Sequence, residues 1–134
     1  MSATAQDRNT PFKDCELVSV PVKGATLIHA GVIVCADATG HAIEGKAAAD
    51  LTYLGRAEQY IDNTKGPDGA AVVLVRRGKA FKWANEPTDS VKQPMLGKRC
   101  FLVDNQTVAA TDGGGKRSRA GTVAGIDADG VWVL

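Results

Sequence analysis

The chain has 134 residues, a length that corresponds to one domain with room for a proper hydrophobic core. Its 16 Lys and Arg against 15 Asp and Glu give a net charge of +1, which excludes the strong basic excess that attracts nucleic acid or anionic membranes. Aromatic residues are few at 5%, whereas 15 glycines separate short apolar runs, a composition that favours turn-rich β structure over a helical bundle.

Cysteines and apolar segments indicate the compartment. Cys15, Cys35 and Cys100 are odd in number, widely spaced and without a CxxC pair, which argues against a disulfide framework and against a zinc site. We expect them to act as small buried hydrophobes in a reducing environment. The sequence shows no apolar core of a signal peptide and no window of about 18 apolar residues, so we expect a soluble protein made in the cytosol.

Residues 1–14 are polar, lack periodicity and include Pro11. Such a segment cannot by itself bury enough apolar surface to offset its ordering entropy. Two interpretations remain open: a frayed terminus, or an arm that becomes ordered on a partner with Phe12 as an anchor.

The next segment contains short apolar runs separated by turn residues. Residues 17–22 alternate imperfectly around Ser19 and Pro21, which predicts an edge strand or the end of one, because proline cannot donate to a ladder. Residues 25–36 are strongly apolar but interrupted at Ala30-Gly31, and Gly31 indicates a bulge or a close backbone approach. We expect a turn at 37–40, a short strand at 41–43, and a loop at 44–50 with room for one helical turn.

Residues 51–61 fit neither the helical nor the strand period well. Gly55 disfavours a helix by about 1 kcal/mol relative to alanine, so we predict a strand with Gly55 at a bulge. The dense turn residues of 62–69 then lead into the centre of the chain.

Residues 69–84 are predicted to be the central element. The unbroken apolar run Ala71–Val75 indicates a strand covered on both faces. In Ala80–Ala84, Phe81 and Trp83 alternate with Lys82, the pattern of a half-buried strand. Gly78-Lys79 suits a type II′ turn, so we predict a central β-hairpin whose aromatic side faces inward.

The rest of the chain predicts further strands joined by loops. We expect a crossing loop at 85–97, with a possible helical turn after Thr88, strands at 99–103 and 107–109, a surface loop at 111–118, and a final hairpin of 122–126 and 131–134 in which Asp-Gly supplies positive φ. The prediction is an all-β fold, a small β-barrel or β-sandwich at residues 15–134, preceded by an extended N-terminal arm at 1–14.

Sequence motifs with known chemistry are incomplete. Gly113–Lys116 lacks both the first glycine and the Ser or Thr of a phosphate loop, because those positions hold Ala110 and Arg117. Asp127–Gly130 lies too near Leu134 to hold an EF-hand loop. We therefore expect no catalytic residues, no metal and no cofactor.

Histidines and basic residues leave two other function classes open. An enzyme would require His29 or His41 in a pocket beside a carboxylate or a cysteine. Basic residues cluster at 76–82 and at 116–119. A single-stranded nucleic-acid binder with an OB-like barrel would need such a basic face together with exposed Phe81 and Trp83.

The order of several segments resembles a known family. The segments are Arg8–Pro11, Val20–Val22, Ala30–Cys35, Ala36–Gly40, Leu54–Tyr60 with Asp62-Asn63, Val75–Trp83 and Val103–Val108. Together they resemble the small capsid proteins encoded in the head-gene cluster of Mu-like tailed bacteriophages and prophages, and the layout is similar to the lambda-type head decoration proteins. The resemblance covers nearly the whole chain from about Arg8 onwards, but its motifs are structural and carry no chemistry.

This resemblance implies a β-tulip-like or related small β-barrel that binds the outer surface of an expanded icosahedral shell and cements it. The implied partners are the major capsid protein and further copies of the chain, usually as a homotrimer and in some relatives as a dimer, with no membrane and no nucleic acid. The implied location is the virion, after synthesis in the bacterial cytoplasm. The contact residues predicted on this basis are Asn9, Thr10, Pro11 and Phe12 in the arm, and Arg76, Arg77 and Lys79 in the body.

Overall fold

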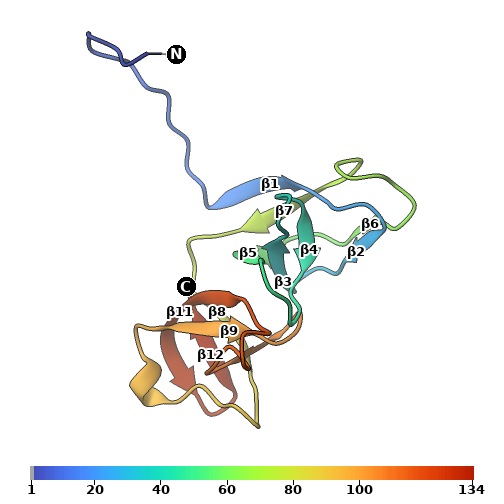
Figure 1. Cartoon of the computed structure of the whole chain (residues 1–134), viewed down its shortest axis with the longest axis vertical. Coiled ribbons are helices and arrows are strands. Elements are labelled where there is room, and N and C mark those ends of the chain that lie inside the picture. The colour runs from blue at the N-terminus through green and yellow to red at the C-terminus, as the bar shows by residue number, and fades with distance from the viewer. Residues whose placement is uncertain (1) are drawn as a thin grey trace.

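The computed structural model describes residues 2–134, which contain twelve β-strands, one short 3₁₀ helix and no α-helix (Figure 1). The predicted all-β class is confirmed. The strands are β1 (Leu17–Pro21), β2 (Thr26–Ile28), β3 (Ile33–Ala36), β4 (Ala42–Glu44), β5 (Thr52–Ala57), β6 (Ile61–Asn63), β7 (Val72–Arg76), β8 (Phe81–Asn85), β9 (Arg99–Leu102), β10 (Thr107–Ala109), β11 (Arg119–Asp127) and β12 (Gly130–Val133).

Strands from the first part of the chain form an antiparallel sheet in the order β1-β7-β5-β3-β4. Strand β1 lies at the edge, as Pro21 at its end predicts. A separate two-stranded ribbon of β2 and β6 extends from this sheet. The predicted turn at 37–40 and the strand that follows it are present, and Gly40 has a φ of 84°.

Strands from the second part close into a barrel in the order β10-β8-β12-β11-β9. Only the contact of β10 with β8 is parallel, and the other pairs in the barrel are antiparallel. The last hairpin, β11 with β12, agrees with the prediction from the sequence. The sheet and the barrel lie one above the other in Figure 1.

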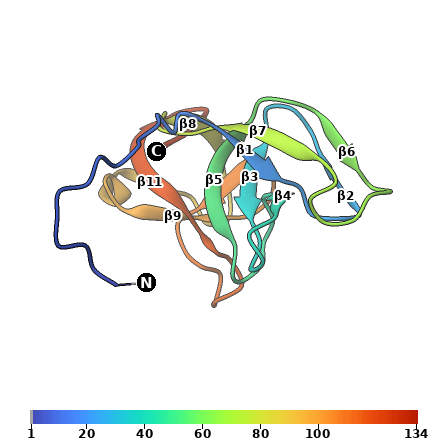
Figure 2. The same ribbon diagram turned by 90° about the horizontal axis from the view of Figure 1, so that it is seen from above.

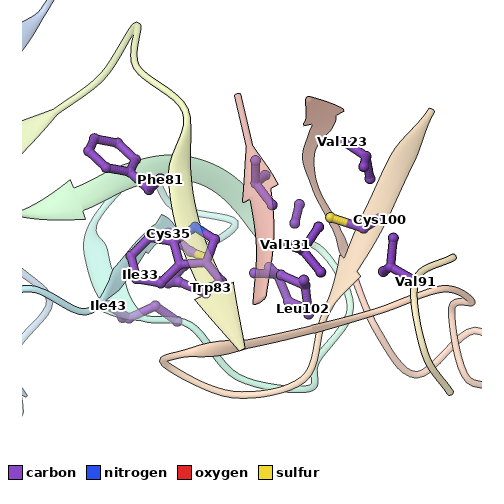
Figure 3. Packing of buried hydrophobic residues seen from close by; sticks show 13 residues of the cluster. Ile33, Cys35, Ile43, Phe81, Trp83, Val91, Cys100, Leu102, Val123 and Val131 are labelled. Carbon is purple, nitrogen blue, oxygen red and sulfur yellow. The ribbon is translucent and has the colours of Figure 1, made fainter. Parts of the chain in front are cut away.

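The buried side chains of these parts form two hydrophobic cores. One lies between the sheet and the barrel, where Ile33 and Cys35 of β3 and Ile43 of β4 join the buried side chains of the barrel, including Trp83 and Leu102 (Figure 3). The other lies on the opposite face of the sheet and contains Val22, Ile28, Val34, Ala42, Ala57, Val73 and Val75. Strand β3 thus contributes to both cores from its two faces, as alternation along a strand requires.

The predicted central hairpin is wrong. Strand β7 pairs with β1 and β5 in the sheet, whereas β8 pairs with β12 and β10 in the barrel. The connection at 77–80 therefore carries the chain from one part to the other, although Gly78 does take a positive φ of 72°. Strand pairing depends on how side chains pack against cross-strand neighbours and on which face is buried, and the turn residues at 78–79 do not determine this. The inward orientation of Phe81 and Trp83 is confirmed, because these side chains are buried.

Strand β7 is not covered on both faces. Val73 and Val75 are fully buried, but Val72 is 51% exposed and Leu74 is partly exposed. An unbroken apolar run does not distinguish a doubly covered strand from one with apolar residues on an open face.

Smaller expectations have mixed outcomes. The bulge at Gly55 is confirmed, since the pairing of β5 with β3 shifts between Val34–Gly55 and Cys35–Tyr53. The helical turn after Thr88 is absent, and a 3₁₀ helix occurs instead at Gln93–Met95. The prediction of a positive φ in the last turn is wrong. Gly130 is needed there for space, because an added Cβ would lie 2.8 Å from the Trp83 carbonyl oxygen.

Candidate functional site

The N-terminal arm is exposed throughout the part that the structure describes. Residues 2–16 contain no strand or helix, residues 2–17 are all exposed, and the arm extends away from the body (Figures 1 and 2). The side-chain hydrogen bonds of residues 2–15 are local, such as that from Arg8 Nη1 to Thr10 Oγ1 at 2.9 Å. Phe12 is 95% exposed. The predicted contact residues Asn9, Thr10, Pro11 and Phe12 are therefore all accessible to a partner.

The root of the arm lies beside two of the predicted basic contact residues. The Arg77 amide donates a hydrogen bond to the Glu16 carbonyl oxygen at 2.8 Å, one residue before β1 begins. The Lys79 ammonium lies 3.2 Å from the Glu16 carboxylate, and both side chains are about half exposed. The structure thus brings Arg77 and Lys79 to the point where the arm leaves the body.

Arg76 has a different environment. Its guanidinium lies 3.3 Å from the Glu58 carboxylate, which also binds Arg56 at 2.7 Å. The hydrogen bond from Arg56, supported by the charges of both arginines, lowers the pKa of Glu58 below its ordinary value. Arg76 is therefore neutralised within the chain, and sequence reasoning missed the acidic residue that does so.

The other basic residues singled out in the sequence are also paired or lie apart. Lys82 binds Asp129 at 2.9 Å, and Arg117 binds Asp89 at 2.9 Å. Phe81 and Trp83 are buried beneath the barrel strands, so they offer no stacking surface beside these charges. The predicted loop at 111–118 is present, and its Arg117 is held to the crossing loop through Asp89.

The two histidines lie in different local networks. His29 Nδ1 is 3.2 Å from the Glu44 carboxylate, which also accepts a hydrogen bond from Asn105. His41 Nδ1 is 2.9 Å from the Thr39 hydroxyl. Over residues 2–134, no group of three or more His, Cys, Asp or Glu residues is arranged to hold a metal ion, and no helix is long and apolar enough to cross a membrane.

A cleft that the sequence did not reveal lies where the sheet meets the barrel. It has a volume of about 520 Å³ and is lined by the first half of β5, the 77–79 connection and the first half of β11. Four basic side chains line it: Arg77, Lys79, Arg99 and Arg119. Arg99 and Arg119 are far apart in the sequence and meet only because β9 pairs with β11, so no local pattern could have indicated the cleft.

Comparison of the chain with protein-family models, with curated proteins and with solved structures found no match.

Proposed function

We propose that this chain is a structural virion protein that binds the outer surface of a tailed-bacteriophage capsid and cements the shell. The observation that carries the proposal is the exposed arm, on which Phe12 is almost fully exposed. The arm extends from a β body that contains two buried hydrophobic cores. An arm of this kind loses its conformational freedom only on the partner, and the rigid body supplies the rest of the contact. The segment order described above supplies the identity of the partner, the major capsid protein.

A cement protein acts through many contacts at once. Copies that associate with each other, as a trimer or a dimer, would bind the lattice with several arms, and such multivalent binding strengthens weak single contacts by roughly a hundredfold or more. Arg77 and Lys79 at the root of the arm would add charged contacts next to the arm itself. Arg76 contributes less, because Glu58 already neutralises it.

Co-sedimentation with empty, expanded phage heads that lack this chain tests the proposal. The full-length chain is compared with a chain that begins at Cys15, and Phe12→Ser is compared with Tyr60→Ser, which alters another exposed aromatic side chain outside the arm. We expect the full-length chain and Tyr60→Ser to sediment with the heads, and the truncated chain and Phe12→Ser to bind at least about tenfold more weakly.

Two results would contradict this assignment. One is an absence of head binding by the full-length chain, and the other is capture of single-stranded DNA that weakens steeply with salt, the behaviour of a nucleic-acid binder. The burial of Phe81 and Trp83 favours the capsid role over that alternative, because these two aromatic rings of β8 are not exposed for bases to stack on.

A further inference from the structure

The cleft between the sheet and the barrel has the dimensions of a binding site. Its volume of about 520 Å³ lies within the range of about 300–1,000 Å³ that is usual for ligand pockets. At one end of the cleft, Ser118 connects the segment before β11 to the segment before β5. Its hydroxyl accepts a hydrogen bond from the Leu51 amide at 3.0 Å and donates one to the Ala48 carbonyl oxygen at 2.6 Å. Strands β5 and β11 form its two sides, and they lie next to each other in Figure 2.

The charged side chains that line the cleft are all basic. Arg77, Lys79, Arg99 and Arg119 line it, and no acidic side chain does. Lys79 is compensated by Glu16 at the rim, and Arg77 donates through Nε to the Leu54 carbonyl oxygen at 2.9 Å. Among residues 2–134, no carboxylate side chain lies within ion-pair distance of the exposed Arg99 and Arg119. These guanidinium groups are therefore available to carboxylates of a ligand.

One side of the cleft is also an open strand edge. Strand β5 pairs with β7 only at Arg56 and Ala57, so its first half, Thr52–Leu54, has no ladder partner on that edge. The Leu54 carbonyl oxygen points to this side, since it accepts the hydrogen bond from Arg77. Because alternate residues of a strand present their polar groups to the same neighbour, Thr52 presents its backbone amide and carbonyl there as well.

From these features we propose that the cleft binds an extended, acidic peptide segment of a partner protein, which adds to the open edge of β5 while its carboxylates pair with Arg99 and Arg119. Main-chain hydrogen bonds to a free edge supply affinity in this mode, and side-chain pockets supply specificity. Arginine suits the second role, because its planar fork binds a carboxylate through two donors. The inference goes beyond the capsid role and can fail or succeed independently, since its test uses only the purified chain and synthetic peptides.

A peptide fits these features better than a nucleic acid. The lining contains Tyr53 and Phe81 as its only aromatic residues, and both side chains are largely buried, so bases would have nothing to stack on. The open edge, in contrast, offers backbone donors and acceptors spaced at about 3.3 Å per residue, the repeat of another extended chain.

The test measures binding of a fluorescently labelled peptide of about six residues that alternates valine and glutamate. A second peptide carries glutamine in place of glutamate. The wild-type chain is compared with the double variant Arg99→Glu/Arg119→Glu and with Lys65→Glu, which changes an exposed charge in the β6–β7 loop, outside the cleft. We expect the acidic peptide to bind the wild type and Lys65→Glu equally, and the double variant at least about tenfold more weakly.

Hydrogen exchange adds a readout of the binding mode. Addition of the acidic peptide should slow exchange of the Thr52 amide in the wild-type chain, and the glutamine peptide should not. Circular dichroism verifies that the double variant is folded. If it is not folded, the single variant Arg119→Gln replaces it, and we expect this variant to bind the acidic peptide about threefold or more weakly than the wild type.

Four results would overturn the proposal: no binding of the acidic peptide, equal binding of the two peptides, equal binding by the wild type and the charge-reversed variant, or unchanged exchange at Thr52 in the complex. Tighter binding of single-stranded oligothymidylate through the same two arginines would overturn it too and would assign the cleft to nucleic acid.

Discussion

At Gly55 the backbone takes a φ of 151°, which L side chains rarely adopt, and an added Cβ would collide with the Arg76 carbonyl oxygen. We predict that Gly55→Ala lowers the free energy of unfolding by about 3 kcal/mol, because backbone strain and overpacking each cost about 1–3 kcal/mol. Urea denaturation measures this loss.

Gly40→Ala is the matched control for this prediction. Gly40 also has a positive φ, of 84°, but nothing lies within 4 Å of an added Cβ. Gly40→Ala should cost about 1–2 kcal/mol, the penalty for an L residue in the left-handed conformation alone. Equal losses in the two variants would show that the close approach of Arg76 contributes nothing.

The Asp37 carboxylate organises the turn after β3. It accepts hydrogen bonds from the Thr39 hydroxyl at 2.6 Å and the His41 amide at 3.1 Å, and it lies 3.1 Å from the Lys23 ammonium. The hydrogen bond from Thr39 makes the largest contribution to holding the pKa of Asp37 well below its ordinary value, and the Lys23 ammonium and the backbone amides add to the effect.

Stability should therefore depend on pH through Asp37. The ionised carboxylate stabilises the folded state fully above the unfolded-state pKa of about 3.9, and this contribution disappears as pH falls toward the folded-state value. We predict that Asp37→Asn costs about 1–2 kcal/mol at neutral pH and that its difference from wild type shrinks below about pH 4. Urea denaturation as a function of pH measures this, with Asp7→Asn in the exposed arm as a control that should change nothing. A difference independent of pH would contradict the prediction.

At the scale of the elements, a side-chain hydrogen bond joins β5 of the sheet to β8 of the barrel. Trp83 Nε1 donates it to the Tyr53 hydroxyl oxygen at 3.0 Å. Burial raises the pKa of Tyr53 to about 12. We predict that Tyr53→Phe lowers the free energy of unfolding by about 1–2 kcal/mol, because it leaves the largely buried indole N–H without its partner. Thermal unfolding measures the loss. Tyr60→Phe, which alters a 58% exposed side chain, should leave stability unchanged, and equal effects would argue against a linking role.

How far the sequence predicts this fold depends on whether the information is local. The bulge at Gly55, the turn at 37–40, the edge position of β1 and the inward orientation of Phe81 follow from residue type and alternation, and all are present. The strand that pairs with β7 cannot be predicted from such local features, because β1, more than fifty residues earlier in the sequence, competes with the adjacent β8 for this pairing. Pairing is decided by burial summed over whole strands, which no turn motif encodes.

The same limit applies to the candidate site. The accessibility of the arm follows from its polarity, and it is present in the structure. The neutralisation of Arg76 by Glu58 and the meeting of Arg99 with Arg119 at one cleft depend on pairings between distant strands. Sequence patterns therefore located Arg76 and Arg119, but they did not single out Arg99, and they did not separate the basic residues that are neutralised from those that are free.

At the scale of the whole molecule, the sheet and the barrel share one hydrophobic core, and we expect this core to make them unfold together. Cys35 of β3 and Cys100 of β9 are both fully buried in this core, one from each part, whereas Cys15 is exposed. Burial raises the pKa of both core thiols to about 12, so neither forms the reactive thiolate in the folded chain at pH 8.

We therefore predict that a thiol reagent modifies Cys15 alone in the folded chain, and that Cys35 and Cys100 become reactive together over one range of urea concentration. Neither the sheet nor the barrel can open without exposing the apolar surface that both share, and this cost of about 25 cal/mol per Å² couples the two parts. Mass spectrometry of a Cys15→Ser variant after short pulses of reagent distinguishes the two buried sites. Reaction of Cys100 at lower urea than Cys35 would mean that the barrel opens by itself, and that the shared core contributes less to the cohesion of the molecule than the cores and ladders within each part.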